Sequence, residues 1–246
     1  MIKLQHIKNC LLLLLILSYT ACKKDSWCNE CFVRTGKVVT VKRTLGAFNQ
    51  IVVYNNLSVF ITQDTVFDIQ VEAGEKLLDY ITTDVTDSIL TIQNKSRCTW
   101  TRNYKKPFNI YIKMPIVKHI TSSTSGSIKS LNTLSNKLYI EIQSAGDVEL
   151  TVNTNAITSN VKSGGNLTLH GKVSSHESTV QSPSFLYCQD LISNYTILKS
   201  YSSGLSYINV TNKLDCDIED IGDVYCYGNP ATVNDTGNGK GKLYLK

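Results

Sequence analysis

A short turn motif returns every 18 to 20 residues along the second half of this 246-residue chain. Most copies centre on a glycine with small or polar neighbours, as in Ser125-Gly126-Ser127. A period of about 20 residues with one small turn per copy is typical of a solenoid, in which each repeat packs only against its neighbours. The equivalent turn residues of the successive copies are Gly126, Gly146, Gly165, Ser184, Gly204, Gly222 and Gly241.

Alternating apolar residues fill the stretches between these turns. Leu138, Ile140 and Ile142 precede one turn, and Val148 and Leu150 follow it. This alternation predicts strands with one face turned inward, whereas helical repeats would need a period of 3.6 residues and leucine-rich repeats their own Leu-x-x-Leu-x-Leu pattern. We therefore expect an all-β, right-handed parallel β-helix with rungs of about 18 to 20 residues, preceded by an N-terminal β-strand cap region.

The repeat also predicts which residues share a column. Equivalent positions of parallel strands stack about 4.8 Å apart. Glycine or another small residue would stand at each corner because the backbone there needs unusual dihedral angles. One inward column should contain Ile142, Val161, Val180, Ser200 and Ile218, and one outward column Lys129, Glu149, Thr168, Tyr187, Tyr207 and Tyr225.

The N-terminus has the pattern of an export signal. Two lysines precede an apolar run at residues 11–17, which is too short to span a bilayer, and small residues lead to Cys22. The order is similar to a lipobox, in which the cysteine receives lipid. We expect a signal peptide at residues 1–21, lipidation of Cys22 and a tether over residues 22–36. An ordinary cleaved signal peptide, with Cys22 free or in a disulfide, is the alternative.

The cysteines that follow Cys22 fall into two groups. Cys28 and Cys31 form a close pair near the N-terminus, and Cys98 lies far along the chain. No second pair at matching spacing supports a zinc site, so we interpret these three as a disulfide tether of the N-terminal segment whose pairing stays open. The three cysteines of the repeat region are expected to be small buried hydrophobic residues in inward columns: Cys188, Cys216 and Cys226.

Several motifs, taken in order, resemble one known family. They are residues 46–53 (GAFNQIVV), 57–63 (LSVFITQ), 67–73 (FDIQVEA), 110–115 (IYIKMP) and 223–230 (DVYCYGNP), together with the Ser-Gly turns. Over residues 37–246 the chain is similar to lipoproteins with a "putative auto-transporter adhesin, head GIN domain". The resemblance implies a β-helical, adhesin-like protein of the cell surface or periplasm, and it implies no particular ligand. The chain departs from the family pattern at Pro183-Ser184, at Leu205-Ser206 and over residues 95–107.

Charge and residue clustering argue against two classes of function. The net charge is +5, or +3 without the two lysines of the signal segment, and the scattered lysines give no nucleic-acid-binding pattern. A glycan-active β-helix enzyme, the main alternative, would need clustered carboxylates on one outer face. The predicted outward column holds only one carboxylate, that of Glu149. His119, His170 and His176 lack metal-ligand spacing. We expect no catalytic residue, no metal and no cofactor.

Three tyrosines are predicted to lie side by side on the outer surface. Tyr187, Tyr207 and Tyr225 occupy successive rungs of the outward column, and Tyr227 lies two residues further along the last strand. An aromatic ladder would stiffen its sheet, whereas a flat tyrosine platform would bind a glycan or a partner protein. We therefore predict a non-enzymatic outer-membrane lipoprotein, periplasmic or surface-facing, that displays an adhesin-like rod. A purely structural envelope role is a further alternative.

Overall fold

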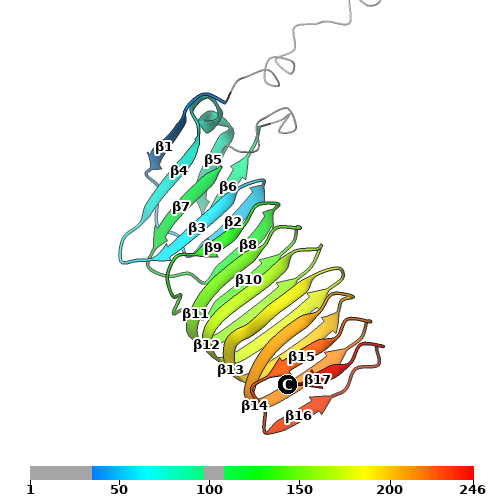
Figure 1. The fold of residues 1–246 in the computed structure, drawn as a ribbon. Coiled ribbons are helices and arrows are strands. Elements are labelled where there is room, and N and C mark those ends of the chain that lie inside the picture. The colour runs from blue at the N-terminus through cyan, green and yellow to red at the C-terminus, as the bar shows by residue number, and fades with distance from the viewer. Residues whose placement is uncertain (1–34, 97–107) are drawn as a thin grey trace, which may run out of the picture.

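The computed structural model describes residues 35–96 and 108–246, and most of them are in β-structure. A 17-stranded sheet coils into a long rod, with the N-terminal strands at one end and the C-terminus at the other (Figure 1). The one helix among the described residues is a short 3-10 helix, Glu75–Tyr80. Within these ranges no helix is long and apolar enough to cross a membrane.

Two faces of parallel strands form the body of the rod. Face A contains β6 (Ile89–Asn94), β2 (Gln50–Asn55), β8 (His119–Thr124), β10 (Leu138–Ile142) and β16 (Thr232–Asp235). Face B contains β7 (Asn109–Met114), β3 (Ser58–Gln63), β9 (Ile128–Ser130), β15 (Val224–Tyr227) and β17 (Leu243–Leu245). Four long strands belong to both faces: β11 (Val148–Val161), β12 (Asn166–Gln181), β13 (Phe185–Tyr201) and β14 (Ser206–Ile218).

Each long strand bends and crosses from face B to face A. In β11, Val148 pairs with Ile128 of β9, while Ile157 pairs with Leu138 of β10. One repeat therefore consists of a face A segment, the small-residue turn and a face B segment. The result is a β-solenoid of about seven turns, as the repeat predicts. The right-handed sense of the coil stays a prediction.

The predicted inward column is confirmed. Ile142 pairs with Val161, and the register continues through Val180, Ser200 and Ile218. These five side chains are at most 3% exposed. Burying an aliphatic side chain completely stabilises a fold by roughly 1.5–3 kcal/mol, and the inward columns repeat that contribution from rung to rung.

The three cysteines of the repeat region also lie in inward columns, as predicted. Cys188, Cys216 and Cys226 are buried and free. Cys216 pairs with Leu198 of the preceding rung, and Cys226 pairs with Ile208. Burial raises the pKa of the Cys216 thiol to about 12 and that of Cys226 to about 11. These thiols therefore stay protonated near neutral pH and pack as small apolar groups.

The corner glycines are needed for close packing and not for unusual dihedral angles, so that part of the prediction is wrong. Gly146 and Gly222 do not have positive φ values. A Cβ atom on Gly146 would lie 2.2 Å from the carbonyl oxygen of Thr124 and 2.3 Å from that of Gly126. A Cβ atom on Gly222 would lie 2.2 Å from the carbonyl oxygen of Gly204. Successive turns therefore stack backbone on backbone and leave no room for a side chain.

Hydroxyl side chains complete these turns. The Thr124 hydroxyl oxygen accepts a hydrogen bond from the Gly126 backbone N–H at 3.0 Å, and Ser202 accepts one from Gly204 at 3.0 Å. The Ser202 hydroxyl donates at 2.7 Å to the carbonyl oxygen of Ser184, one rung earlier. A serine or threonine two residues before the corner thus satisfies a buried backbone donor, which explains the Ser/Thr-x-Gly pattern of the repeat.

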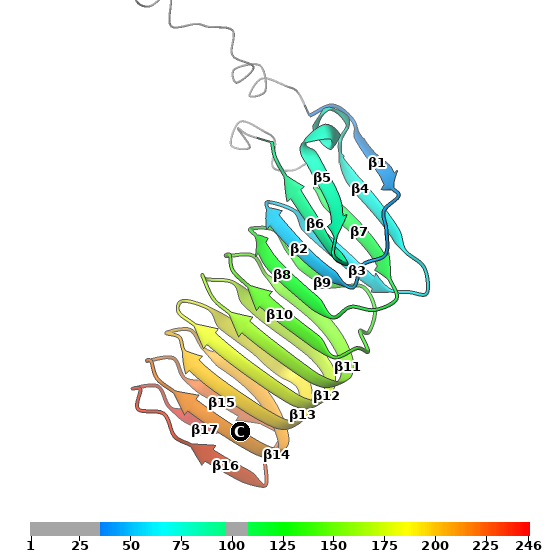
Figure 2. The ribbon, with the colours of Figure 1, turned by 180° about the vertical axis from the view of Figure 1, so that it is seen from behind.

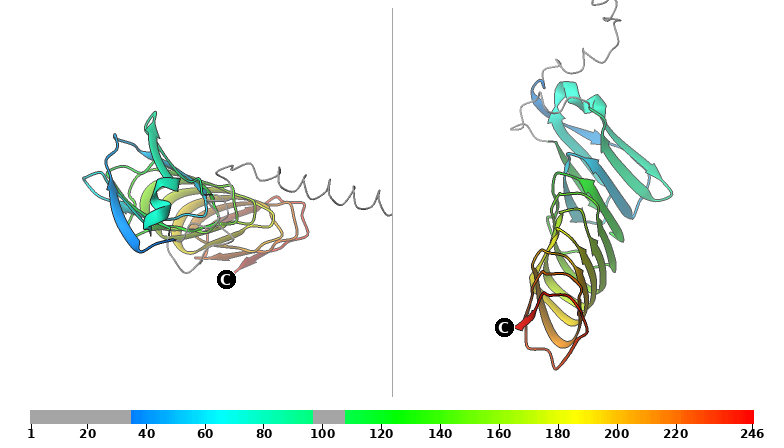
Figure 3. Two further views of the ribbon diagram at one scale, coloured as in Figure 1. Left: turned by 90° about the horizontal axis from the view of Figure 1, so that it is seen from above. Right: turned by 90° about the vertical axis from the view of Figure 1, so that its right-hand side faces the viewer.

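The N-terminal end is a mixed sheet. Strand β4 (Asp68–Gly74) lies antiparallel between β1 (Val38–Arg43) and β7, and β5 (Ile81–Thr86) is antiparallel to β6 (Figures 2 and 3). Strands β6 and β7 stack on β2 and β3, although they follow them in the sequence. The chain therefore folds back on its first rung before it begins the regular stack. The expected N-terminal β-strand region is confirmed.

Several predictions concern residues outside the described ranges. They are the signal peptide at residues 1–21, the lipidation of Cys22, most of the 22–36 tether, and the three tether cysteines Cys28, Cys31 and Cys98.

Candidate binding site

An aromatic row runs along the outside of face B near the C-terminal end. Tyr187 of β13, Tyr207 of β14, Tyr225 of β15 and Tyr244 of β17 pair in register. Successive ring centroids are 5.8, 5.3 and 5.1 Å apart, with interplanar angles of 11°, 15° and 14°. The side-by-side placement of the first three follows the predicted register. We call these four residues the tyrosine ladder.

The ladder follows from the parallel pairing of equivalent positions. Successive side chains of a strand point to opposite faces, and the residues after the first three tyrosines, Cys188, Ile208 and Cys226, are buried. The tyrosines therefore point outward. Register places their rings one rung apart, within the range of about 4.5–7 Å that suits offset-stacked aromatic pairs. Each such pair contributes roughly 0.5–1.5 kcal/mol beyond simple burial.

The rings of the ladder are partly exposed. Tyr187, Tyr207 and Tyr225 are half-buried, and Tyr244 is 37% exposed. Because the centroid separations exceed the carbon–carbon contact distance of about 3.5–4.0 Å, neighbouring rings are offset and do not fully cover one another. Burial raises the pKa of Tyr225, and the nearby Asp223 raises it further. The Tyr225 hydroxyl therefore stays protonated and can donate a hydrogen bond.

Tyr227, the fourth predicted site residue, borders the ladder without joining its stack. It occupies the next outward position of β15, pairs with Asn209 and is 36% exposed. At the C-terminal end of the ladder, the Lys246 ammonium group lies 5.4 Å from the Tyr225 ring centroid and 5.9 Å from that of Tyr244. A cation within about 6 Å of a ring centroid is attracted by the ring. Positive charge therefore borders this end of the ladder.

Lys129 and Glu149 occupy the middle of the same outward column, and His170, in register with Thr151, lies beside it. Lys129 Nζ lies 2.7 Å from Glu149 Oε2, and the ring of His170 lies 3.7 Å from Glu149 and 3.5 Å from Asp190. The hydrogen bond from Lys129 lowers the pKa of Glu149. A glycosidase needs a carboxylic acid whose pKa is raised so that it can donate a proton. Glu149 is shifted in the opposite direction, so the cluster does not resemble such a site.

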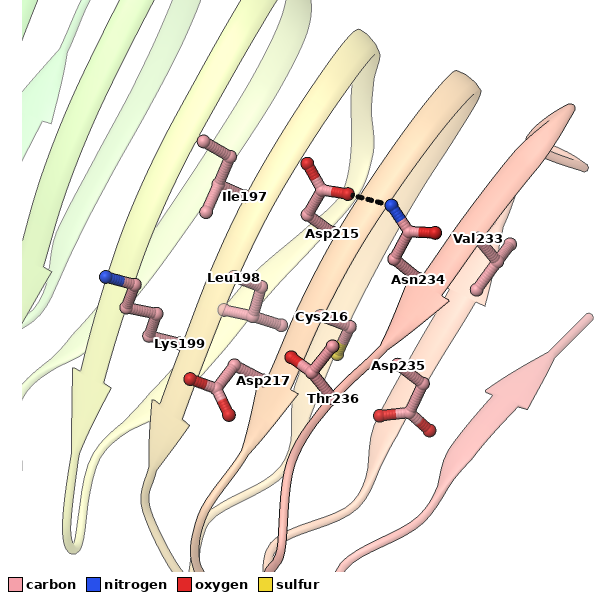
Figure 4. Close-up of a pocket in the computed structure, with 10 residues that line it drawn as sticks. All are labelled: Ile197, Leu198, Lys199, Asp215, Cys216, Asp217, Val233, Asn234, Asp235 and Thr236. Carbon is pink, nitrogen blue, oxygen red and sulfur yellow. Dashed lines mark hydrogen bonds between the residues drawn. The ribbon is translucent and has the colours of Figure 1, made fainter.

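A shallow hollow of about 580 Å³ lies on face A over β13, β14 and β16 (Figure 4). Asp215 lines it and accepts hydrogen bonds from the Tyr195 hydroxyl at 2.5 Å, the Lys213 ammonium at 2.9 Å and the Asn234 amide at 2.6 Å. These donors, Tyr195 foremost, lower the pKa of Asp215 to about 2. The carboxylate is thus ionised and engaged in linking three strands. In the described part of the chain, no three His, Cys, Asp or Glu side chains form a group that could hold a metal.

His176 points inward. It is 1% exposed, and its Nε2 atom lies 3.1 Å from the hydroxyl oxygen of Ser159, which donates to Ser178 at 2.8 Å. Burial lowers the pKa of His176 to about 4. The ring is therefore neutral near neutral pH. Sealed in the core, this Ser–His contact has no access to a substrate.

Residues 47–230 match the family described as "putative auto-transporter adhesin, head GIN domain". The chain belongs to this family. The matched region of the head GIN domain includes Tyr187, Tyr207, Tyr225 and Tyr227, while Tyr244 and Lys246 lie beyond it.

Solved structures share the fold of this head GIN domain. A "putative adhesin" from Bacteroides fragilis has a TM-score of 0.80 at 19% identity, covering 87% of this chain and all (100%) of that one. A "putative adhesin" from Parabacteroides merdae has a TM-score of 0.67 at 17% identity, covering 87% of this chain and 98% of its own. One from Parabacteroides distasonis has a TM-score of 0.64 at 17% identity, with coverages of 86% and 98%. No curated protein matches the chain.

Three aromatic residues in or beside the outward column were not predicted from the sequence. Tyr244 follows Tyr225 by 19 residues, one repeat length, which is the signal that would have found it. Phe185 lies on the same strand as Tyr187, with ring centroids 6.1 Å apart and planes 3° apart. The missed Phe60 pairs with Lys129, so the ladder column itself continues to the N-terminal end of the stack.

Proposed function

We propose that this protein is a non-enzymatic cell-envelope lipoprotein whose rod binds glycans through the tyrosine ladder. The observation that carries the proposal is the in-register stack of four partly exposed tyrosine rings on one outer face. The family and the solved structures of the same fold are described as putative adhesins, which supports a role in binding to a surface.

A row of tyrosines suits a carbohydrate chain. The face of an aromatic ring packs against the apolar C–H face of a sugar, and the phenol hydroxyl exchanges hydrogen bonds with sugar hydroxyls. The stacked rings are already ordered by their neighbours, so little conformational entropy is lost when a ligand binds. Repetition from rung to rung lets several sugar units of one chain bind together.

The described chain begins, at residue 35, at the opposite end of the rod from the ladder (Figure 1). A lipid on Cys22 and the tether over residues 22–36 would attach the protein through its N-terminal end. The ladder lies on β13, β14, β15 and β17, at the C-terminal end (Figure 1). We expect an outer-membrane location, periplasmic or surface-facing, in which the rod holds the ladder away from the membrane.

The structural role is the second candidate, because the rings stack on one another as well as facing solvent. A ladder that only stiffens face B would contribute to stability without any ligand. The glycan-active enzyme is less well supported, since Glu149 has a lowered pKa and lies half-exposed beside Lys129. Binding and stability must therefore be measured on the same variants.

The test is a glycan-array screen of the lipid-free chain (Cys22→Ser) with Tyr207→Ser as the ladder variant. Tyr201→Ser is the matched control, because Tyr201 is 44% exposed at the end of β13 and lies outside the ladder. We expect the wild-type chain and the control to bind the same glycans, and Tyr207→Ser to lose them while remaining folded. Absence of glycan binding by the wild-type chain would contradict the proposal. Unchanged binding with a lower melting temperature in Tyr207→Ser would favour the structural role.

A further inference from the structure

We infer that the glycan held by the tyrosine ladder is acidic, an inference that rests on the proposed function. Strand β17 and its flanks read Lys242-Leu243-Tyr244-Leu245-Lys246. The two leucines pair with Val224 and Cys226 of the inward columns. By the alternation of a strand, both lysines project on the same side as the last ring of the ladder.

Neither lysine has a carboxylate partner. Across residues 35–96 and 108–246 the ion pairs involve other side chains, so the ammonium groups of Lys242 and Lys246 are unpaired. The nearby Asp223 carboxylate accepts a hydrogen bond from the Lys242 backbone N–H at 2.9 Å. By contrast, Lys129, further up the same outward column, is paired with Glu149 at 2.7 Å.

Lys246 places a positive charge beside the last two rings of the tyrosine ladder. Its ammonium group lies 5.4 Å from the Tyr225 centroid and 5.9 Å from that of Tyr244. A sugar ring packed on the end of the ladder would therefore carry its substituents to the same place as this cation. A carboxylate or sulfate on that sugar gains charge-assisted contacts with the two lysines, which a neutral sugar does not.

The expected gain is modest because both lysines are exposed. An exposed ion pair changes affinity by about 1.5- to 5-fold, and salt screens it over a distance of about 8 Å at physiological ionic strength. The preference for an acidic glycan should therefore weaken as salt is added, while the stacking of sugar on tyrosine should not.

The experiment is calorimetric titration of the lipid-free chain with three hexasaccharides: maltohexaose, sulfated maltohexaose and hexagalacturonate. The first two share one backbone, so their difference reports the sulfate, and the third reports a carboxylate. The test variant is Lys242→Gln/Lys246→Gln. The matched control is Lys172→Gln/Lys199→Gln, which removes two exposed, unpaired charges remote from the ladder.

We expect at least one acidic hexasaccharide to bind more tightly than maltohexaose, and only the test variant to lose that preference. Equal affinity for neutral and acidic sugars would overturn the inference, as would equal weakening by the control variant. Lysine-dependent binding of poly-glutamate in place of any sugar would also overturn it, because the partner would then be an acidic peptide. If Tyr207→Ser abolishes the binding of all three sugars while the lysine variant changes none, the proposed function stands and this inference fails. Failure of all three to bind would overturn this inference, and only absence of binding on the glycan array as well would contradict the proposed function.

Discussion

The rings of Tyr207 and Tyr225 have centroids 5.3 Å apart, although 18 residues separate the two tyrosines in the sequence. The contact exists because Ser206, Tyr207 and Ile208 pair in register with the first residues of β15. Each inner ring of the ladder thus has a ring above it and a ring below it. Removing one ring should therefore also remove a stacking contact of its neighbour, and mutagenesis can detect this coupling.

Tyr207→Ala and Tyr225→Ala should not be additive. The double variant should lose less stability than the sum of the single variants, with a coupling of roughly 0.5–1.5 kcal/mol, because either change alone already removes the ring contact. Urea unfolding of the four proteins measures this coupling. As a control, Tyr207→Ala combined with Tyr201→Ala should be additive within about 0.5 kcal/mol. Additivity of the ladder pair would show that the stacked rings do not stabilise each other.

Gly146→Ala should destabilise the rod, whereas Gly46→Ala should not. The new Cβ would lie 2.2 Å from a carbonyl oxygen at Gly146 and would have no neighbour within 4 Å at Gly46. Overpacking of this kind costs about 1–3 kcal/mol, while alanine at an unhindered glycine position stabilises by about 0.4–1 kcal/mol. Thermal unfolding of the two variants measures the difference. Equal melting temperatures would refute the account of the stacked turns.

Acid should destabilise the protein through His176. Its pKa is lowered to about 4 in the folded chain, against about 6.5 when unfolded. Above pH 6.5 both states are neutral. As the pH falls from 6.5 towards 4, the unfolded chain binds a proton that the folded chain does not, so stability is lost. Between pH 7 and pH 5 this loss should be about 2 kcal/mol, and it should be absent in His176→Leu. An identical pH dependence of unfolding in the two proteins would contradict the prediction.

The three core thiols should resist alkylation. Burial raises the pKa of Cys188, Cys216 and Cys226, and alkylating reagents need an accessible thiolate. Iodoacetamide at pH 8 should label these three positions in denaturant and not in the native protein. Mass spectrometry of the cysteine-containing peptides separates them from the other cysteines of the chain. Rapid native labelling of Cys188 would show that the core opens at that rung.

Lipidation of Cys22 is testable in cells. Metabolic labelling with a fatty-acid analogue should mark the wild-type chain and leave Cys22→Ser unmarked, because lipid transfer requires the thiol. Equal labelling of the two chains would remove the anchor from the proposed function.

The repeat region could be predicted closely from the sequence because one turn motif marks each rung. Gly126 and Gly146 set the register, and strand alternation then placed Ile142 inward and Tyr207 outward, as the structure confirms. The predicted outward column ended at Tyr225, although Gly241 marks one more turn, over residues 236–241, that is less regular than the others. Tyr244 was missed for that reason.

The N-terminal arrangement could not be predicted in this way. Strands β6 and β7 pair with β2 and β3 on the side away from the later rungs, and no periodic turn marks that return. The repeat pattern also does not predict which side chains of neighbouring columns are in contact. His170 lies outside the predicted outward column and contacts both Glu149 of that column and Asp190, and the corner glycines owe their identity to carbonyl groups of the preceding rung.

The pairing of β1 with β4 has a mechanical consequence. β1 is bonded to β4 from Val38 opposite Gly74 to Arg43 opposite Ile69, and these hydrogen bonds run across the strands. If the chain is held by its N-terminus while a ligand pulls on the far end, tension enters at Val38 and is directed along those bonds. They would break one after another, which takes less force than shearing a whole strand at once. At this end of the rod β1 would detach before the strands behind it and lengthen the tether.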